Sequence, residues 1–178
     1  MTPLTSPLPP PTAPLRLRPP RHRVERRAIG WWALRSLLGG GSVTALAVAT
    51  ALLAGPLTGP VRPWLWPATG LIAALALAHL LVVPLWRYRV HRWETTDDAV
   101  YTRAGWLWQE SRVAPMSRVQ TVDTTRGPLQ RLFGLAGVTV TTASAAGPLV
   151  ITGLDHERAR ALVTRLTESA LATPGDAT

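Results

Sequence analysis

Two apolar stretches, "WWALRSLLGGGSVTALAVATALLAG" (residues 31–55) and "LWPATGLIAALALAHLLVVPL" (residues 65–85), decide the fold of this chain. The first has 25 residues and the second has 21, enough for about 37 Å and about 31 Å of α-helix at about 1.5 Å per residue. A bilayer's hydrocarbon core is about 30 Å thick, so each helix is long enough to cross it. The first stretch has no charge from Gly41 onward, and the second has one ionisable side chain, His79. The pattern predicts a transmembrane helical hairpin.

The segment between the stretches and the residues at their ends fit this interpretation. The connecting segment is rich in proline, which cannot continue a helix, so a turn is predicted there. Tryptophan is typical of membrane interfaces, and the tryptophans near the ends are Trp31, Trp32, Trp64, Trp66 and Trp86. One alternative is a buried hairpin of a soluble protein, and another is a secretory or twin-arginine signal peptide. The second apolar stretch and its basic exit favour two spans.

The formal net charge of +9 is placed unevenly along the chain. Residues 1–92 contain 11 Arg and one acidic residue, whereas residues 93–178 contain 8 Arg and 9 acidic residues. Arginines precede the first stretch and follow the second, and the turn between them has Arg62 alone. By the positive-inside bias, we expect a two-span protein of the cell membrane with both termini in the cytoplasm.

Four regions are predicted along the chain. Residues 1–28 are expected to form a disordered cytoplasmic tail rich in Pro and Arg, and residues 29–86 the transmembrane hairpin. Residues 87–172 are expected to fold as one domain, and residues 173–178 to form a C-terminal tail.

Short strands followed by one helix are predicted for the folded domain. The first strand is expected at residues 88–96, and the second is expected to turn at residues 103–105. A third strand, "WLWQESRVA", places Val113 on the expected core face, with Trp106 and Trp108 on the opposite face.

Helical spacing replaces the strand pattern near the C-terminus. Asp155 is a suitable N-cap, and the apolar positions are Ala159, Leu162, Val163, Leu166 and Ala170. The predicted fold class is therefore α+β, with two N-terminal transmembrane helices followed by a curved antiparallel sheet capped by a C-terminal helix. Pleckstrin-homology-like (PH-like) domains are built in this way.

A more specific resemblance lies in "RVQTVDTTRGPLQRLFGLAGVTVTTA" (residues 118–143), which resembles the signature of bacterial PH-like domains of the YdbS type. The matching positions are Arg118, Val119, Gln120, Gly127, Pro128, Leu129, Arg131, Leu132, Gly134, Val138, Val140, Thr142 and Ala143. The resemblance covers about residues 30–170 and leaves out the Pro-rich tail. It implies a bacterial membrane protein, often found beside a larger relative that carries several such domains, and it supplies no biochemical activity.

The sequence contains no familiar catalytic motif, such as a phosphate-binding glycine loop, a nucleophile elbow or a paired-histidine metal motif. Its four histidines lie in separate segments and it has no cysteine, which disfavours a metal site. We therefore expect a non-enzyme without a cofactor, a small-molecule substrate or a nucleic-acid partner.

Two groups of residues are candidates for binding. Arginines bind anionic groups through forked hydrogen bonds, and the candidates for this role are Arg112, Arg118, Arg126 and Arg131. The alternative, which we favour for each, is a structural role such as pairing with Glu110 or Asp123. Trp106 and Trp108 are the candidate anchors of a protein contact.

The charge distribution decides between two functional hypotheses. The first is a membrane-anchored interaction or scaffold module that associates with itself or with a membrane partner. The alternative is a sensor of anionic lipid headgroups, which needs a strongly positive face. Because residues 93–178 sum to −1, the interaction module is the preferred hypothesis.

Overall fold

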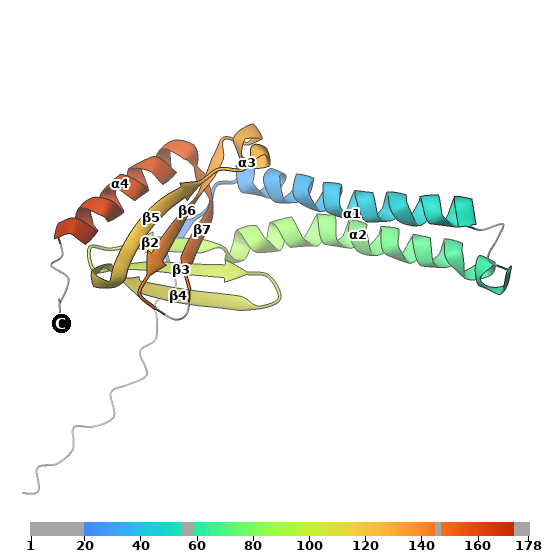
Figure 1. Cartoon of the computed structure of the whole chain (residues 1–178), viewed down its shortest axis with the longest axis horizontal. Helices are drawn as coiled ribbons and strands as arrows, with labels where there is room; N and C mark the ends of the chain where they lie inside the picture. The colour runs from blue at the N-terminus through green and yellow to red at the C-terminus, as the bar shows by residue number, and fades with distance from the viewer. Residues whose placement is uncertain (1–19, 55–58, 145–146, 173–178) are drawn as a thin grey trace, which may run out of the picture.

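The computed structural model describes residues 20–54, 59–144 and 147–172. A long helical hairpin projects from one end of a small domain that combines antiparallel sheets with a C-terminal helix (Figure 1). The hairpin consists of α1 (Arg27–Ala54) and α2 (Arg62–Val90), joined through the short 3-10 helix η1 (Gly59–Val61). This is the α+β architecture that the sequence predicts.

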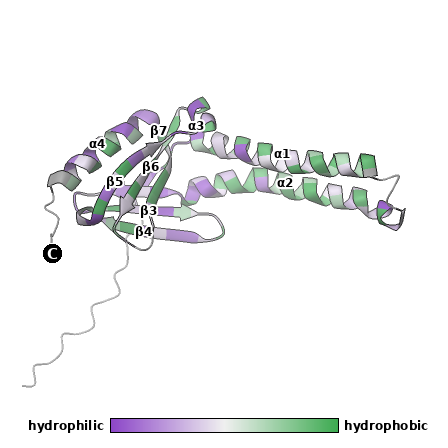
Figure 2. Ribbon diagram, in the orientation of Figure 1, coloured by the Kyte–Doolittle hydropathy of each residue, from purple (hydrophilic) through white to green (hydrophobic). Residues whose placement is uncertain are grey.

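Hydrophobic residues predominate along both helices of the hairpin, and hydrophilic residues gather mainly near the domain and at the tip (Figure 2). Both helices are long and apolar enough to cross a membrane, and in their most apolar windows only 6% and 17% of the residues are buried. Helices of soluble proteins bury an apolar face against a core, whereas Leu46, Leu53 and Leu75 here are 68%, 78% and 62% exposed. The exposure argues against a buried hairpin of a soluble protein and agrees with two membrane spans.

The domain contains two antiparallel sheets. The first has the strand order β1-β2-β3-β4, and its strands are β1 (His22–Arg23), β2 (Arg92–Thr95), β3 (Ala99–Gly105) and β4 (Gln109–Pro115). The second has the order β5-β6-β7, with β5 (Val119–Thr125), β6 (Leu135–Thr142) and β7 (Leu149–Asp155). A 3-10 turn, η2 (Met116–Arg118), leads from β4 to β5, and the short helix α3 (Pro128–Leu132) leads from β5 to β6.

Helix α4 (His156–Ala172) lies across the second sheet and closes the core of the domain (Figure 1). Leu162 and Leu166 are buried in this core, and Val163 packs against it, as the helical spacing predicted. The helix begins beside Asp155, whose Oδ1 accepts a hydrogen bond of 3.0 Å from the backbone N–H of Glu157. The predicted N-cap is therefore confirmed.

The predicted disordered tail is wrong for residues 20–28. His22 and Arg23 pair with Trp93 and Arg92 in the first sheet, and helix α1 already begins at Arg27. Val24 is 5% exposed, so this segment packs as part of the fold. No local pattern indicates this pairing, because β1 is two residues long and its partner strand lies about seventy residues away. Residues 1–19 and 173–178 lie outside the described residues.

Two strand boundaries also differ from the prediction. Residues 88–90 continue helix α2, because Tyr88 packs against the base of the hairpin, and tertiary packing overrides β-propensity. Strand β3 runs through residues 103–105, so the turn lies at residues 106–108 instead. Gly105 has φ +121°, and a Cβ there would lie 1.8 Å from the carbonyl oxygen of Trp108, so only glycine fits this turn.

The predicted core face of the third strand is inverted. Ala114 of β4 is 5% exposed and belongs to the core, whereas Val113 is 38% exposed. Side chains alternate along a strand, so one misplaced face reverses the assignment of every residue on it. Trp106 and Trp108 are on neither face, because both lie in the turn.

Candidate functional site

The base of the hairpin shares a small core with the domain. Trp31 and Trp32 of α1 are 8% and 2% exposed, and they pack with Val24, Ala28 and Leu135. The predicted role of Trp31 and Trp32 as anchors in the membrane interface is therefore wrong, because protein rather than lipid surrounds them. Other tryptophans of the hairpin do remain exposed: Trp64 by 71%, Trp66 by 55% and Trp86 by 44%.

Polar contacts fix the same junction. The backbone N–H of Glu25 donates to the carbonyl oxygen of Gly153 at 2.9 Å. A Cβ at Gly153, which has φ +78°, would lie 2.9 Å from the Cβ of Ala28, so glycine permits this close approach. On the surface, Arg158 pairs with Glu25 at 2.7 Å, and Arg27 pairs with Asp155. The hairpin and the domain therefore form one packed unit.

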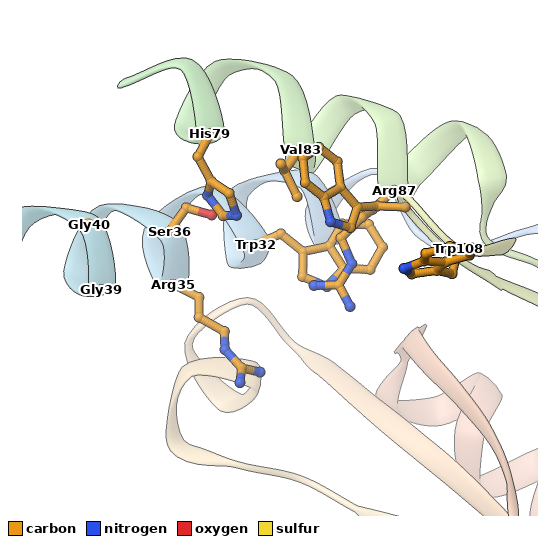
Figure 3. A pocket seen from close by; sticks show the side chains of 11 residues that line it. Trp32, Arg35, Ser36, Gly39, Gly40, His79, Val83, Arg87 and Trp108 are labelled. Carbon is orange, nitrogen blue, oxygen red and sulfur yellow. The ribbon is translucent and has the colours of Figure 1, made fainter. Parts of the chain in front are cut away.

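A cavity of about 490 Å³ lies between the two helices and the turn that joins β3 to β4; we call it the junction cleft. Its polar lining comes from Arg35 and Ser36 of α1 and from His79 and Arg87 of α2. Its aromatic lining comes from Trp32, Trp106 and Trp108. Figure 3 shows the side chain of Arg87 beside Trp32, whereas the side chain of Arg35 extends from α1 away from His79 and Trp108.

The junction cleft carries positive charge without a counter-charge. The guanidinium of Arg87 lies over the ring of Trp32, 5.1 Å from its centroid, and it repels that of Arg35 electrostatically. None of the residues that line the cleft is acidic, and neither arginine has an ion pair within the described part of the chain. The arrangement suits an anionic group.

The turn of residues 106–108 forms one wall of the cleft. Trp86 of α2 donates a hydrogen bond of 3.0 Å from Nε1 to the carbonyl oxygen of Trp106. The ring of Trp106 also meets His79 edge-on, with 5.9 Å between the centroids. Leu107 and Trp108 are 72% and 88% exposed, so the tip of the turn is an apolar surface beside the base of α2 (Figure 1).

The four arginines singled out in the sequence do not come together. Arg112 bonds to Glu110 at 2.6 Å and to the carbonyl oxygen of Pro148 at 3.0 Å, which is the structural alternative. Arg118 precedes β5 and Arg126 follows it, so the two lie at opposite ends of a strand, about 26 Å apart at about 3.3 Å per residue. Arg131 is exposed on α3, at the same end as Arg126.

Sequence reasoning missed the cationic residues of the junction cleft. Arg35 was the available signal, because a charged residue inside a predicted span is costly and marks a functional site by default. Arg87 was interpreted as a topology signal. Their proximity depends on the antiparallel hairpin and on the β3–β4 turn, which no local pattern reveals.

His91 packs against Trp32, which lines the cleft, and makes the stability of the fold depend on pH. It is 5% exposed, its Nδ1 lies 2.8 Å from the carbonyl oxygen of Arg87, and its ring centroid lies 5.0 Å from that of Trp32. Burial lowers the pKa of His91 to about 4; the bond to the Arg87 carbonyl opposes this shift, and the nearby Arg87 charge adds to it.

The lowered pKa predicts a loss of stability on mild acidification. An unfolded His91 takes up a proton below about pH 6.5 and the folded one below about pH 4, so stability is lost as pH falls between these values. From pH 7.5 to 5 the free energy of unfolding should fall by about 2 kcal/mol through this group. Thermal unfolding in detergent at several pH values measures how the stability depends on pH, and His91→Gln should weaken this dependence. If the variant kept the same pH dependence of stability, His91 would not be its cause.

Two comparisons with known proteins indicate the family to which this chain is related. The family model "Bacterial PH domain" matches residues 36–170. The chain is similar to the UPF0699 transmembrane protein YdbS of Bacillus subtilis (strain 168), with 25% identity over 149 residues. That alignment covers 83% of this chain and 92% of the relative. No solved structure matches the chain.

Proposed function

Because the chain belongs to the bacterial PH domain family and is a transmembrane protein of the YdbS type, we propose that it is a non-catalytic interaction module held at the cytoplasmic face of the membrane. The observation that carries this proposal is the shared core at the junction, where Trp31 and Trp32 of the hairpin pack with Leu135 of the domain. A domain fixed in this way keeps one orientation relative to the bilayer and presents the same surfaces to every neighbour.

The side chains of the junction cleft support a binding role rather than catalysis. Guanidinium groups and indole rings hold ligands without transferring protons at neutral pH. Ser36 and His79 point toward each other (Figure 3). Within the described residues, however, no hydrogen bond joins them and no carboxylate orients His79, so the general-base arrangement of a nucleophilic serine is missing.

The apolar turn supports contact with a second membrane protein, in the first instance a second copy of this chain. Trp108 and Leu107 are exposed next to Trp86 at the base of α2, close to where the apolar surface of the hairpin begins. A partner anchored in the same bilayer reaches this position without crossing the headgroups. Confinement to one membrane also raises the local concentration, which favours weak contacts.

Self-association can be tested with two differently tagged copies of the full chain. We expect recovery of the second copy to fall about tenfold in the double variant Trp106→Ala with Trp108→Ala, since buried tryptophans dominate many interfaces. The matched control is Trp64→Ala with Trp66→Ala, which removes two exposed tryptophans at the other end of α2. Equal recovery from the two double variants would refute the role of the turn. Failure of the unaltered chains to co-purify would refute self-association.

The cytoplasmic orientation is a separate prediction that rests on the basic flanks of the hairpin. The chain has no cysteine, so single substitutions label without background. We expect Val61→Cys, in the turn of the hairpin, to react with an impermeant thiol reagent on intact cells. Glu168→Cys, on α4, should react only after permeabilisation. The reverse pattern would place the domain outside the cell.

A further inference from the structure

We propose that the junction cleft binds the phosphate group of an anionic phospholipid, with Arg35 and Arg87 as its two cationic contacts. The first observation is the unmet charge described above. Two guanidinium groups line one cavity, and none of the lining residues supplies a carboxylate. Like charges that line one cavity repel each other, and the oxygens of a bound phosphate group can accept hydrogen bonds from guanidinium groups.

The depth of the cleft in the membrane fits a headgroup. Arg87 lies three residues before the end of α2, and Arg35 lies eight residues after the start of α1, about 12 Å along the helix. Arginine side chains near the ends of spans extend toward the interface. Trp86 and the exposed Trp108 lie at the same base of the hairpin, where indole rings favour the headgroup level.

The shape of the cleft leaves room for the rest of a lipid. Gly39 and Gly40 line the cleft on α1, and a Cβ at Gly39 would meet no atom within 4 Å. Beyond these glycines the helices expose leucines and valines, so an acyl chain can continue from the cleft along an apolar surface. A soluble phosphate ester gains nothing from that surface. This asymmetry, cationic at one end and apolar at the other, is the reason for choosing a phospholipid.

The site differs from the headgroup sensor considered from the sequence, which relied on arginines of the domain. Arg112 is already paired, and Arg118 and Arg126 lie at opposite ends of β5. The proposed site instead uses both spans and the β3–β4 turn together. It does not depend on self-association, because none of its contacts requires a second copy.

Thermal unfolding of the full chain in mixed micelles tests the proposal, because a ligand that binds the folded state raises the unfolding temperature with its concentration. The probes are phosphatidylglycerol and phosphatidylcholine, which share acyl chains and differ in net charge. We expect stabilisation by phosphatidylglycerol over phosphatidylcholine, and a loss of at least tenfold in apparent affinity in Arg35→Gln with Arg87→Gln. The matched control, Arg118→Gln with Arg131→Gln, removes the same charge from the domain and should bind as the unaltered chain does.

Each other outcome overturns the proposal. Equal loss in both double variants would mean a general charge effect, and equal stabilisation by the two lipids would mean no recognition of the anion. Stabilisation by inorganic phosphate or glycerol 3-phosphate to the same extent as by phosphatidylglycerol would identify a soluble anion as the ligand. If the double variant fails to fold, the single variant Arg35→Gln answers the question alone, because Arg35 is exposed and has no ion pair within the described part of the chain. Unaltered affinity there would contradict the assignment.

Discussion

Replacing Leu166 by Asp is expected to unfold the PH domain while leaving the hairpin helical. Leu166 is 0% exposed and packs in the core between α4 and the second sheet. The substitution removes a buried apolar side chain, worth about 1.5–3 kcal/mol, and places an unpaired carboxyl group in the core, which adds several kcal/mol more. Because small domains are stable by only about 5–15 kcal/mol, we expect most of that margin to disappear. Near-ultraviolet circular dichroism and thermal unfolding in detergent measure the effect.

Ala161→Asp is the matched control for this change. It introduces the same charge into the same helix, but residue 161 is exposed, so its effect should stay below about 1 kcal/mol. If Leu166→Asp melted at the same temperature as Ala161→Asp, α4 would not be docked on the sheet.

The elements that the sequence predicted well are those with a local, periodic signal. The hairpin follows from two uninterrupted apolar stretches, and α4 follows from apolar residues at helical spacing after the N-cap Asp155. The motif of residues 118–143 identified the family because its glycines and prolines stand in one continuous segment. In each case the residues that specify the element are neighbours in the chain.

The features that the sequence did not predict depend on contacts between distant residues. Strand β1 is too short to have a pattern of its own, and it is ordered by pairing with β2. Trp31 and Trp32 have the residue type and the sequence position that are typical of interfacial anchors. Their packing with residues distant in the chain, such as Leu135, makes them core residues. The junction cleft likewise combines α1, α2 and the β3–β4 turn. A turn displaced by a few residues was enough to move Trp106 and Trp108 from a sheet to the end of the domain beside the hairpin.

Replacing Trp32 by Ala is expected to separate the hairpin from the domain. Trp32 is 2% exposed, lies against Trp31 and His91, and has the guanidinium of Arg87 over its ring. Removal of a buried tryptophan costs about 3–5 kcal/mol, because the cavity it leaves closes only in part. The loss falls on the shared core rather than on the core of the domain. We therefore expect limited proteolysis in detergent to cut the short connection between α2 and β2, which lies between Val90 and Arg92.

Trp64→Ala is the control that separates this effect from a general loss of tryptophan. Trp64 belongs to α2 as well, but it is 71% exposed at the far end of the hairpin, away from the domain. Its removal should leave both the melting temperature and the proteolytic pattern of the domain as they are. If Trp32→Ala resembled Trp64→Ala in both measurements, the packing of Trp32 would contribute nothing to the attachment of the hairpin to the domain. The proposed interaction module would then lose its main structural basis, because the shared core around Trp32 is the apolar contact that fixes the orientation of the PH domain on the hairpin.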